Sequence, residues 1–506
     1  MKSNLVGAID QGTSSSRFII FDISLKKVVA SHQEKISQFC PKSGWVEICP
    51  KQIYDSVMKC IEEACKKLSR TNYSVSQIRS VGLANQRETT IVWDSSCGEP
   101  LFNAIVWLDC RTAQLADEFI EKTPDKSKDF LKSKTGLPIH SYFSALKIRW
   151  LLDNVNEVQN SLQRGTLMFG TVDSWLLWKL TGKHITDVTN ASRTLLMDLN
   201  KLDWSLELCK FFKIPRSILP KICSSAEFYS NILHGPLKGI PFTGCLGDQQ
   251  AAMLGQNCIQ YTDIKSTYGT GTFVLCNTGT NLIISKNGLL SSIGYQLGKN
   301  TSVTYVLEGS GSIGGNSVRF LRDNLAIINN LSEVENLANS VKDSGGVIFV
   351  PSFSGLFAPY WDSTARGTMF GLDQSTRKGH IVRAVLQAIC CQTAELIDAF
   401  ENDLGAKCVL GKLKIDGKVT SNVLFNQMLS DTIGRSIFCC PLAEATSWGA
   451  ALASAIGANI ISVDELNSFS FDKNAIKYDA KGNNEERMKL MFAWKEAIKR
   501  TQNWIS

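Results

Sequence analysis

Residues 5–22 read LVGAIDQGTSSSRFIIFD, and this stretch decides the fold. The apolar runs at residues 5–9 and 17–22 are short, which is typical of buried strands. A polar turn at residues 10–16 separates them. Its Gly12 lets the backbone approach a ligand closely, and its hydroxyl and amide groups can donate to phosphate oxygens. The stretch therefore predicts two strands joined by a turn that can hold an anionic group.

The second half of the chain contains a similar unit. Residues 264–268 and 273–277 predict two strands, and the turn Gly269-Thr270-Gly271-Thr272 joins them. Helical periodicity over residues 51–68 and 380–404 alternates with such strands, as in α/β proteins. One strand–turn–strand unit in each half suggests a duplicated domain, and we place the boundary between residues 257 and 258.

Length and composition narrow the class of protein. A chain of 506 residues is too long for one hydrophobic core, and 44% hydrophobic with 20% charged residues is typical of a globular protein. The formal net charge of +7 is scattered, so we expect no nucleic-acid partner. The longest small and apolar stretch, residues 449–461, is shorter than the ~20 residues of a membrane span, so we expect no transmembrane segment.

The sixteen cysteines do not predict a disulfide framework or a metal centre. The chain has no Cys-x-x-Cys pair, its five histidines stand far apart, and no His-Glu-x-x-His motif is present. The doublets at residues 390–391 and 439–440 lie in apolar stretches. We therefore expect reduced, structural thiols and a cytoplasmic protein.

A third turn, at residues 415–417 (IDG), leads from a strand into a helix that begins near Asn422. Amides at such a helix start favour an anionic ligand. An ordinary tight turn remains the alternative for each of the three turns. No Gly-x-x-x-x-Gly-Lys-Ser/Thr run is present, which excludes a Walker-type NTPase at the level of motifs.

Residues 309–314 (GSGSIG) match the dinucleotide-binding fingerprint. However, no second strand ending in an acid follows ~20 residues later, as that fold requires. A glycine-rich helix start near a nucleotide is the better interpretation.

Two polar clusters could bind a second substrate. Residues 85–90 (NQRETT) place Arg87 and Glu88 just after a predicted strand at residues 79–83, and the alternative is a solvated ion pair on a loop. Residues 247–250 (GDQQ) place Asp248 between a strand and a helix, where it could instead be an N-cap. Asp10, at the end of the first strand, could hold Mg²⁺ through water.

Many runs in the chain resemble the glycerol kinases of the FGGY family of carbohydrate kinases. The similar runs are residues 10–13, 44–47, 85–90, 103–107, 142–154, 169–175, 189–194, 247–250, 268–271 and 367–387. The resemblance implies two ribonuclease-H-like (actin-type ATPase) α/β domains with an interdomain cleft. Residues 1–257 would form the glycerol and phosphate side, and residues 258–506 the nucleotide side. Relatives commonly form homodimers or homotetramers.

By this resemblance, the chain would transfer the γ-phosphoryl group of ATP to glycerol, with Mg²⁺ as cofactor and sn-glycerol 3-phosphate as product. Asp248 would be the general base, and Asp10 and Asp248 would place the metal. The residues expected to bind glycerol are Arg87, Glu88, Trp107, Tyr142, Asp248, Gln249 and Phe273. Those expected on the nucleotide side are Thr13, Ser14, Ser15, Arg17, Thr270, Gly315, Arg319, Lys418 and Asn422.

The chain departs from the family pattern at three positions on the expected nucleotide side. Lys418 replaces the second glycine of the adenosine loop, and a positive φ there would strain it by ~1 kcal/mol or more. Alternatively, the loop bends differently and the ammonium group of Lys418 faces solvent or a phosphate. Arg319 stands where some members have Gln, and Trp448 where Leu is common. A kinase for a related small polyol or ketose, such as dihydroxyacetone, is one alternative. A ligand-binding member without turnover is the other, and only Lys418 supports it.

Overall fold

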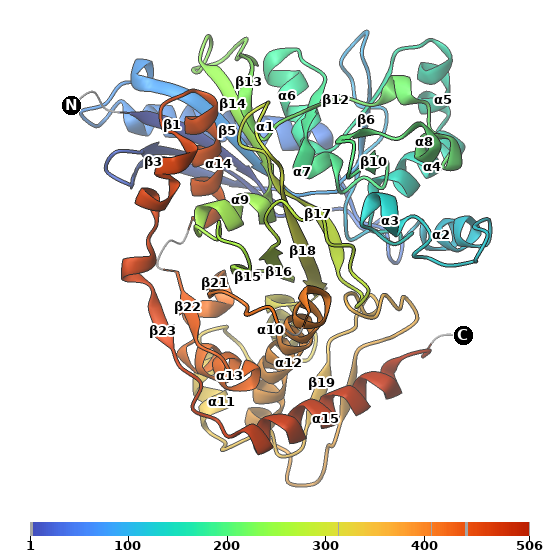
Figure 1. Cartoon of the computed structure of the whole chain (residues 1–506), viewed down its shortest axis with the longest axis vertical. Coiled ribbons are helices and arrows are strands. Elements are labelled where there is room, and N and C mark those ends of the chain that lie inside the picture. The colour runs from blue at the N-terminus through green and yellow to red at the C-terminus, as the bar shows by residue number, and fades with distance from the viewer. Residues whose placement is uncertain (1–3, 312, 406, 441–443, 505–506) are drawn as a thin grey trace.

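The computed structural model describes residues 4–504, apart from residues 312, 406 and 441–443. Two mixed sheets, one in each half of the chain, form its centre, and Figure 1 shows them in the upper and lower parts of the molecule. The first sheet has the order β13 (Ala226–Asn231), β14 (Pro241–Gly247), β5 (Ile78–Asn85), β1 (Leu5–Gln11), β2 (Ser15–Asp22), β3 (Lys27–Lys35). The second has the order β17 (Leu290–Tyr295), β18 (Thr304–Gly311), β16 (Thr272–Asn277), β15 (Ile264–Tyr268), β21 (Leu413–Asp416), β22 (Ile437–Cys439), β23 (Ile476–Tyr478).

Both sheets repeat one pairing pattern around a buried strand. β1 pairs antiparallel with β2 and parallel with β5, and β15 pairs antiparallel with β16 and parallel with β21. The turn of each hairpin therefore lies at the carboxyl end of a central strand, where ligands bind in α/β sheets. The strands expected in these units are confirmed, whereas the boundary between residues 257 and 258 stays a prediction.

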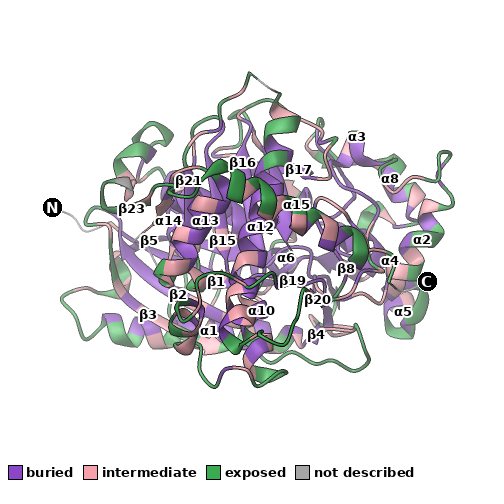
Figure 2. Cartoon of the chain, turned by 90° about the horizontal axis from the view of Figure 1, so that it is seen from below, coloured by how far each residue is buried: buried purple, intermediate pink, exposed green. Residues whose placement is uncertain are grey.

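Helices and short strand pairs surround the two sheets, and Figure 2 shows the buried interior inside a partly exposed shell. The helices are α1 (Pro50–Leu68), α2 (Ala113–Ile120), α3 (Lys132–Thr135), α4 (Ser144–Asn154), α5 (Asn156–Gln163), α6 (Val172–Thr181), α7 (Val188–Ala191), α8 (Leu206–Phe211), α9 (Asp248–Gly255), α10 (Gly315–Asp323), α11 (Glu333–Asn339), α12 (Lys378–Leu404), α13 (Val423–Ile433), α14 (Ala445–Gly457) and α15 (Asn484–Thr501). The short strands are β4 (Glu47–Ile48), β6 (Ile91–Asp94), β7 (Ala104–Ile105), β8 (Leu167–Gly170), β9 (Ile185–Asp187), β10 (Met197–Asp198), β11 (Asp203–Trp204), β12 (Lys221–Cys223), β19 (Ile348–Val350) and β20 (Thr368–Phe370).

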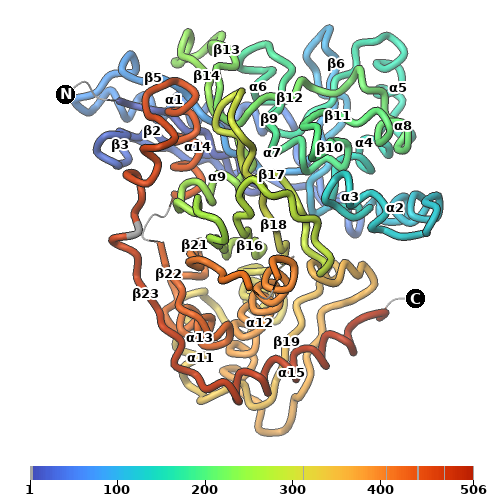
Figure 3. The backbone as a smooth tube through the Cα atoms, in the orientation of Figure 1, coloured from blue at the N-terminus to red at the C-terminus, as the bar shows by residue number. Residues whose placement is uncertain are grey.

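Helix α14 comes late in the chain but packs on the first sheet and on α9, as Figure 3 shows. A Cβ added at Gly449 would lie 1.8 Å from the carbonyl oxygen of Ala251, and one at Gly255 would lie 1.9 Å from that of Ala445. The two helices therefore touch through their backbones, which only glycine permits at such a distance. Because α9 begins with Asp248, this contact fixes the helix that carries the expected base.

Trp448 on the same helix is fully buried. Its ring lies 5.1 Å from that of Phe21 in an edge-to-face arrangement. Trp448 therefore packs in the core, and its place near the nucleotide side stays a prediction. None of the sixteen cysteines is in a disulfide. A search of the described residues finds no helix with the length and hydropathy of a membrane span.

Candidate active site

The turn between β1 and β2 links the expected phosphate side to the expected glycerol side. The amide of Gly12 donates to the carbonyl oxygen of Ser15 at 2.9 Å, which closes the turn. Thr13 and Ser15 are partly exposed and Ser14 is exposed, so these donors are accessible. The indole Nε1 of Trp107 donates to Oγ1 of Thr13 at 2.9 Å. Trp107 therefore connects the two predicted subsites directly.

The carboxylate of Asp10, near the end of β1, is surrounded by charged and polar side chains. Nη1 of Arg17 lies 3.9 Å from its carboxylate and donates to Glu444 at 2.7 Å. The hydroxyl of Ser447 lies 3.4 Å from Asp10. The pKa of Asp10 is raised to about 6, chiefly by burial; Arg17 opposes this rise, and Glu444 and Asp248 add to it. Because β1 and β14 both pair parallel with β5, Asp10 and Asp248 lie at the same carboxyl edge of the first sheet.

The second turn packs against the start of α10. The amides of Gly314 and Gly315 donate to the carbonyl oxygens of Thr270 and Gly269 at 2.9 and 2.8 Å. A Cβ at Gly315 would lie 2.8 Å from the oxygen of Gly269. The glycines of residues 309–314 thus allow close packing of a strand, a turn and a helix, while Ser312 lies outside the described residues. Arg319 is exposed on α10.

The third turn decides between the two alternatives for Lys418. Gly417 has φ +100°, and a Cβ there would lie 2.4 Å from the carbonyl oxygen of Tyr268. Lys418 is exposed and does not have a positive φ, so the expected strain is absent. Asn422 caps α13 by accepting a hydrogen bond from the amide of Phe425 at 2.9 Å.

Arg87 and Glu88 are buried, so the solvated ion pair considered for them is wrong. They also bind other partners. Arg87 donates to both carboxylate oxygens of Glu308 at 2.6 and 2.8 Å, and Arg193 Nε donates to Glu88 at 2.5 Å. The backbone of Glu88 has φ +60°, an uncommon conformation for a residue other than glycine. Strain of this kind persists where the surroundings hold it in place, often at functional sites.

Asp248 is the first residue of α9, and Gly247 stands at the N-cap position, so the capping interpretation is wrong. Its Oδ1 lies 3.4 Å from Nε of Arg87. Its side chain is 27% exposed, which leaves the carboxylate accessible to a substrate. Burial raises the pKa of Asp248, and Arg87 and Lys265 limit the rise.

Gln249 is oriented by a buried lysine. Nζ of Lys265 on β15 donates to Oε1 of Gln249, and also to Oγ1 of Thr267 at 2.7 Å. An ammonium group can only donate, so the amide oxygen of Gln249 faces Lys265 and its NH₂ group points away. Burial lowers the pKa of Lys265 to about 8, against the attraction of Asp416 and Asp248.

Three aromatic rings form a wall beside these polar groups. The ring of Trp107 lies 5.7 Å from those of both Tyr142 and Phe273, each in an edge-to-face arrangement. The guanidinium of Arg87 lies 5.8 Å from the ring of Phe273. The structure therefore places an apolar wall next to carboxylate, amide and guanidinium groups, the combination that a polyol requires.

Comparison with known proteins agrees with this geometry. The model of the N-terminal domain of the FGGY family of carbohydrate kinases matches residues 5–255, and the model of the C-terminal domain matches residues 264–458. The chain belongs to the FGGY family of carbohydrate kinases.

Individual relatives of this FGGY kinase are similar over almost their whole length. The chain is 54% identical to a probable glycerol kinase of Caenorhabditis elegans over 99% of both chains, and 45% identical to a glycerol kinase of Brucella anthropi over 99% of this chain and 100% of that one. The crystal structure of Plasmodium falciparum glycerol kinase with ADP is similar at a TM-score of 0.88 and 37% identity, covering 99% of this chain and 98% of that one. These findings confirm the resemblance and the two-domain fold.

Sequence analysis of this FGGY kinase missed three charged residues of the site, namely Arg193, Lys265 and Glu308. Each lies in the interior, at 0% exposure. Glu308 follows the apolar pair Val306 and Leu307 within the mostly buried strand β18, and Lys265 follows the first residue of β15. A charged residue inside a buried strand is a signal in itself, because such a charge must be paired.

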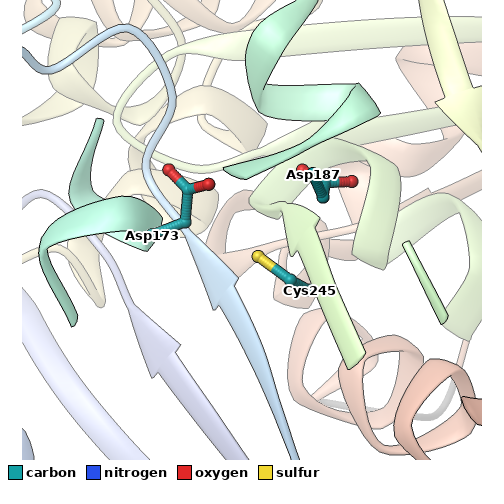
Figure 4. A group of neighbouring side chains, drawn as sticks. All are labelled: Asp173, Asp187 and Cys245. Atoms are coloured by element: carbon teal, nitrogen blue, oxygen red, sulfur yellow. The ribbon is translucent and has the colours of Figure 1, made fainter. Parts of the chain in front are cut away.

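A second buried group lies beside the site, where Asp173, Asp187 and Cys245 meet (Figure 4). Their candidate ligand atoms lie within 4.8 Å of one another. Asp187 accepts hydrogen bonds from Thr189, Asn190 and Ser225, and it caps α7, the helix that leads to Arg193. Neutral donors thus satisfy the hydrogen-bonding capacity of the buried Asp187 carboxylate. By capping α7, Asp187 also fixes the backbone that leads to Arg193.

Proposed function

We propose that this FGGY kinase transfers the γ-phosphoryl group of ATP to a terminal hydroxyl of glycerol, giving sn-glycerol 3-phosphate. The contact between Arg87 and the partly exposed Asp248, next to an aromatic wall, is the observation that carries the proposal. Identities of 54% and 45% to proteins named as probable glycerol kinase and glycerol kinase support the choice of acceptor.

The carbon backbone of glycerol would pack against the rings of Trp107 and Phe273. Its hydroxyls would bond to Arg87, Glu88, Tyr142, Asp248 and Gln249. Because the amide oxygen of Gln249 faces Lys265, Gln249 would offer its NH₂ group to a hydroxyl oxygen. A site that bonds every hydroxyl rejects analogues lacking one, because buried polar groups then remain unpaired.

Asp248 would act as general base. One of its carboxylate oxygens would accept the proton of the attacking hydroxyl as the bond between that hydroxyl oxygen and the γ-phosphorus forms. Burial makes this carboxylate more basic than an exposed one, while the contact with Arg87 holds its orientation. Since phosphoryl transfer has a loose transition state, most of the rate would come from positioning and charge neutralisation.

The hydroxyl and amide groups of the three turns would bind the nucleotide. This assigns Thr13, Ser14, Ser15, Arg17, Thr270, Gly315, Arg319 and Asn422 to ATP or ADP, with Lys418 contributing through its backbone amide, and the ADP in the Plasmodium falciparum relative supports a nucleotide site. Asp10 and Asp248 would hold Mg²⁺, because both carboxylates are partly exposed and such oxygen ligands fit a hard cation. When bound, the cation would neutralise charge on the β- and γ-phosphates.

A coupled assay of the purified protein with Mg²⁺-ATP and a panel of polyols and ketoses tests the proposal. Glycerol should have the highest kcat/KM. A higher value for dihydroxyacetone or another small polyol would assign a different acceptor to the same mechanism, and no turnover with any of them would remove the proposal. Cytoplasmic location, a homodimer or homotetramer, and the boundary between residues 257 and 258 stay predictions.

A further inference from the structure

A carboxylate of the C-terminal domain lies between two arginines of the N-terminal domain. Glu308 accepts from Nη1 and Nη2 of Arg87 at 2.6 and 2.8 Å, and Nη1 of Arg193 lies 3.4 Å from its Oε2. The hydroxyl of Ser310 donates to its Oε1 at 3.0 Å. Burial alone would raise the pKa of Glu308, but Arg193 and Arg87 outweigh it and lower that pKa to about 2. The carboxyl group of Glu308 is therefore ionised near neutral pH.

Each arginine also contacts a carboxylate of the proposed acceptor site. Arg87 Nε lies 3.4 Å from Asp248, and Arg193 Nε donates to Glu88 at 2.5 Å. A guanidinium group is planar and rigid, so a carboxylate that binds its terminal nitrogens also fixes the direction of Nε. Glu308 thus sets the direction of both contacts without belonging to the glycerol-binding set.

The hairpin of β17 and β18 brings Glu308 to this place. Figure 1 shows the hairpin running from the second sheet towards the N-terminal domain. The amide of Ser225 donates to the carbonyl oxygen of Gln296, just after β17, at 2.9 Å, and the hydroxyl of Tyr305 on β18 donates to the carbonyl oxygen of Leu199 at 3.2 Å. The ion pairs of Glu308 therefore exist only when the hairpin is docked on the N-terminal domain.

We propose that Glu308 is a positioning residue of the acceptor site, which holds Arg87 and Arg193 so that Asp248 and Glu88 face the polyol only when the two domains are docked. This inference rests on the proposed function. The charged cluster consists of two arginines, Arg87 and Arg193, and the carboxylates of Glu88, Asp248 and Glu308. If Glu308 lost its charge, the terminal nitrogens of Arg87 would turn to Asp248. A bidentate ion pair would then occupy the oxygens that Asp248 needs to accept a proton.

The variant Glu308→Gln tests this role by steady-state kinetics, with glycerol and ATP varied separately. We expect kcat/KM for glycerol to fall on the order of 10²-fold, as for other small displacements of catalytic groups, while the KM for ATP stays within about twofold. The more conservative Glu308→Asp keeps the charge and should lose about tenfold. Glu485→Gln, which removes an exposed partner of Lys489, is the matched control and should behave as wild type.

The outcomes are separable. An inactive wild-type protein would remove the proposed function and this inference together. An active wild type with an unchanged kcat/KM for glycerol in Glu308→Gln would overturn the positioning role alone, and so would a KM for ATP that rises as much as kcat/KM for glycerol falls. If Glu308→Gln does not fold, Glu308→Asp decides, because a merely structural role would lower its melting temperature without a loss selective for glycerol. Retained stabilisation of either variant by ADP, together with the selective loss, supports the proposal.

Discussion

Arg87 Nε lies 3.4 Å from Oδ1 of Asp248, although Arg87 follows strand β5 and Asp248 begins helix α9. The register explains their approach, because β5 and β14 are parallel neighbours and their carboxyl ends meet at one edge. Asn85, the last residue of β5, pairs with Gly247, the residue before Asp248. The sheet itself therefore aligns the candidate base with its cationic partner.

Replacing Asp248 with Asn should abolish most turnover and leave the fold intact. The amide has the same shape but cannot accept the proton, and the loss of one positioned base typically costs about 10²–10⁴-fold in kcat. ADP should still raise the melting temperature, since the turns that would bind it are unchanged. Asp203→Asn, at an exposed ion pair with Arg216, is the control. Near-wild-type kcat in Asp248→Asn would refute the role of the base.

Replacing Arg87 with Ala should harm glycerol use and stability together. It removes a donor for glycerol, so the KM for glycerol should rise while the KM for ATP changes little. It also leaves Glu308 buried with only Arg193 as its charged partner, and breaking such a pair costs about 3–5 kcal/mol. Glycerol titrations and thermal melts measure the two effects. An Arg87→Ala protein as stable as the Arg216→Ala control would show that the ion pair contributes little.

The sequence predicted the elements of the site better than their contacts. The strands around the turns at residues 10–16 and 269–272 were predictable because short apolar runs flanked by polar turns with Gly, Ser and Thr are local signals. The capping interpretation of Asp248 and the solvated interpretation of Arg87 and Glu88 fit the same local signals. The first is wrong because Gly247 takes the N-cap position, and the second because partners from distant segments, Glu308 and Arg193, bind Arg87 and Glu88 in the interior.

The same reason explains the charged residues that sequence analysis missed. Lys265 is adjacent to Gln249 only because the second sheet meets α9, and no spacing along the chain encodes that contact. Lys418 shows the reverse case, since a family pattern suggested strain that the backbone avoids by giving the positive φ to Gly417 alone.

The pair Asp173 and Asp187 should make stability depend on pH. Burial and the neighbouring Asp187 raise the pKa of Asp173 from 3.8 to about 6, so the folded state holds a proton that the unfolded state has released at pH 5. Stability is therefore lost as the pH rises from about 4 to about 6, by about 2–3 kcal/mol for this group. Asp173→Asn carries no such charge and can keep the hydrogen-bond geometry to Thr186.

Thermal melts of wild type and Asp173→Asn across pH check this assignment. The variant should melt at a higher temperature than wild type at pH 8, and the difference should shrink or disappear at pH 5. Asp203→Asn serves as the exposed control. A constant difference between Asp173→Asn and wild type at all pH values would mean that Asp173 is ionised in the folded state at pH 5 as well.

Nucleotide affinity should depend on Gly417 and not on Lys418. At Gly417 a side chain would meet the carbonyl oxygen of Tyr268 at 2.4 Å in a backbone with φ +100°, so Gly417→Ala must displace the loop between β21 and α13. We expect the Kd for ADP, measured by calorimetry, to rise about tenfold or more, because a displaced backbone misplaces the amides that would bind the nucleotide. Lys418 is exposed with an ordinary φ, so Lys418→Gly should change the Kd for ADP by less than about threefold. A strong loss in Lys418→Gly would instead assign its ammonium group to a phosphate, and an unchanged Kd in Gly417→Ala would place the nucleotide away from this turn.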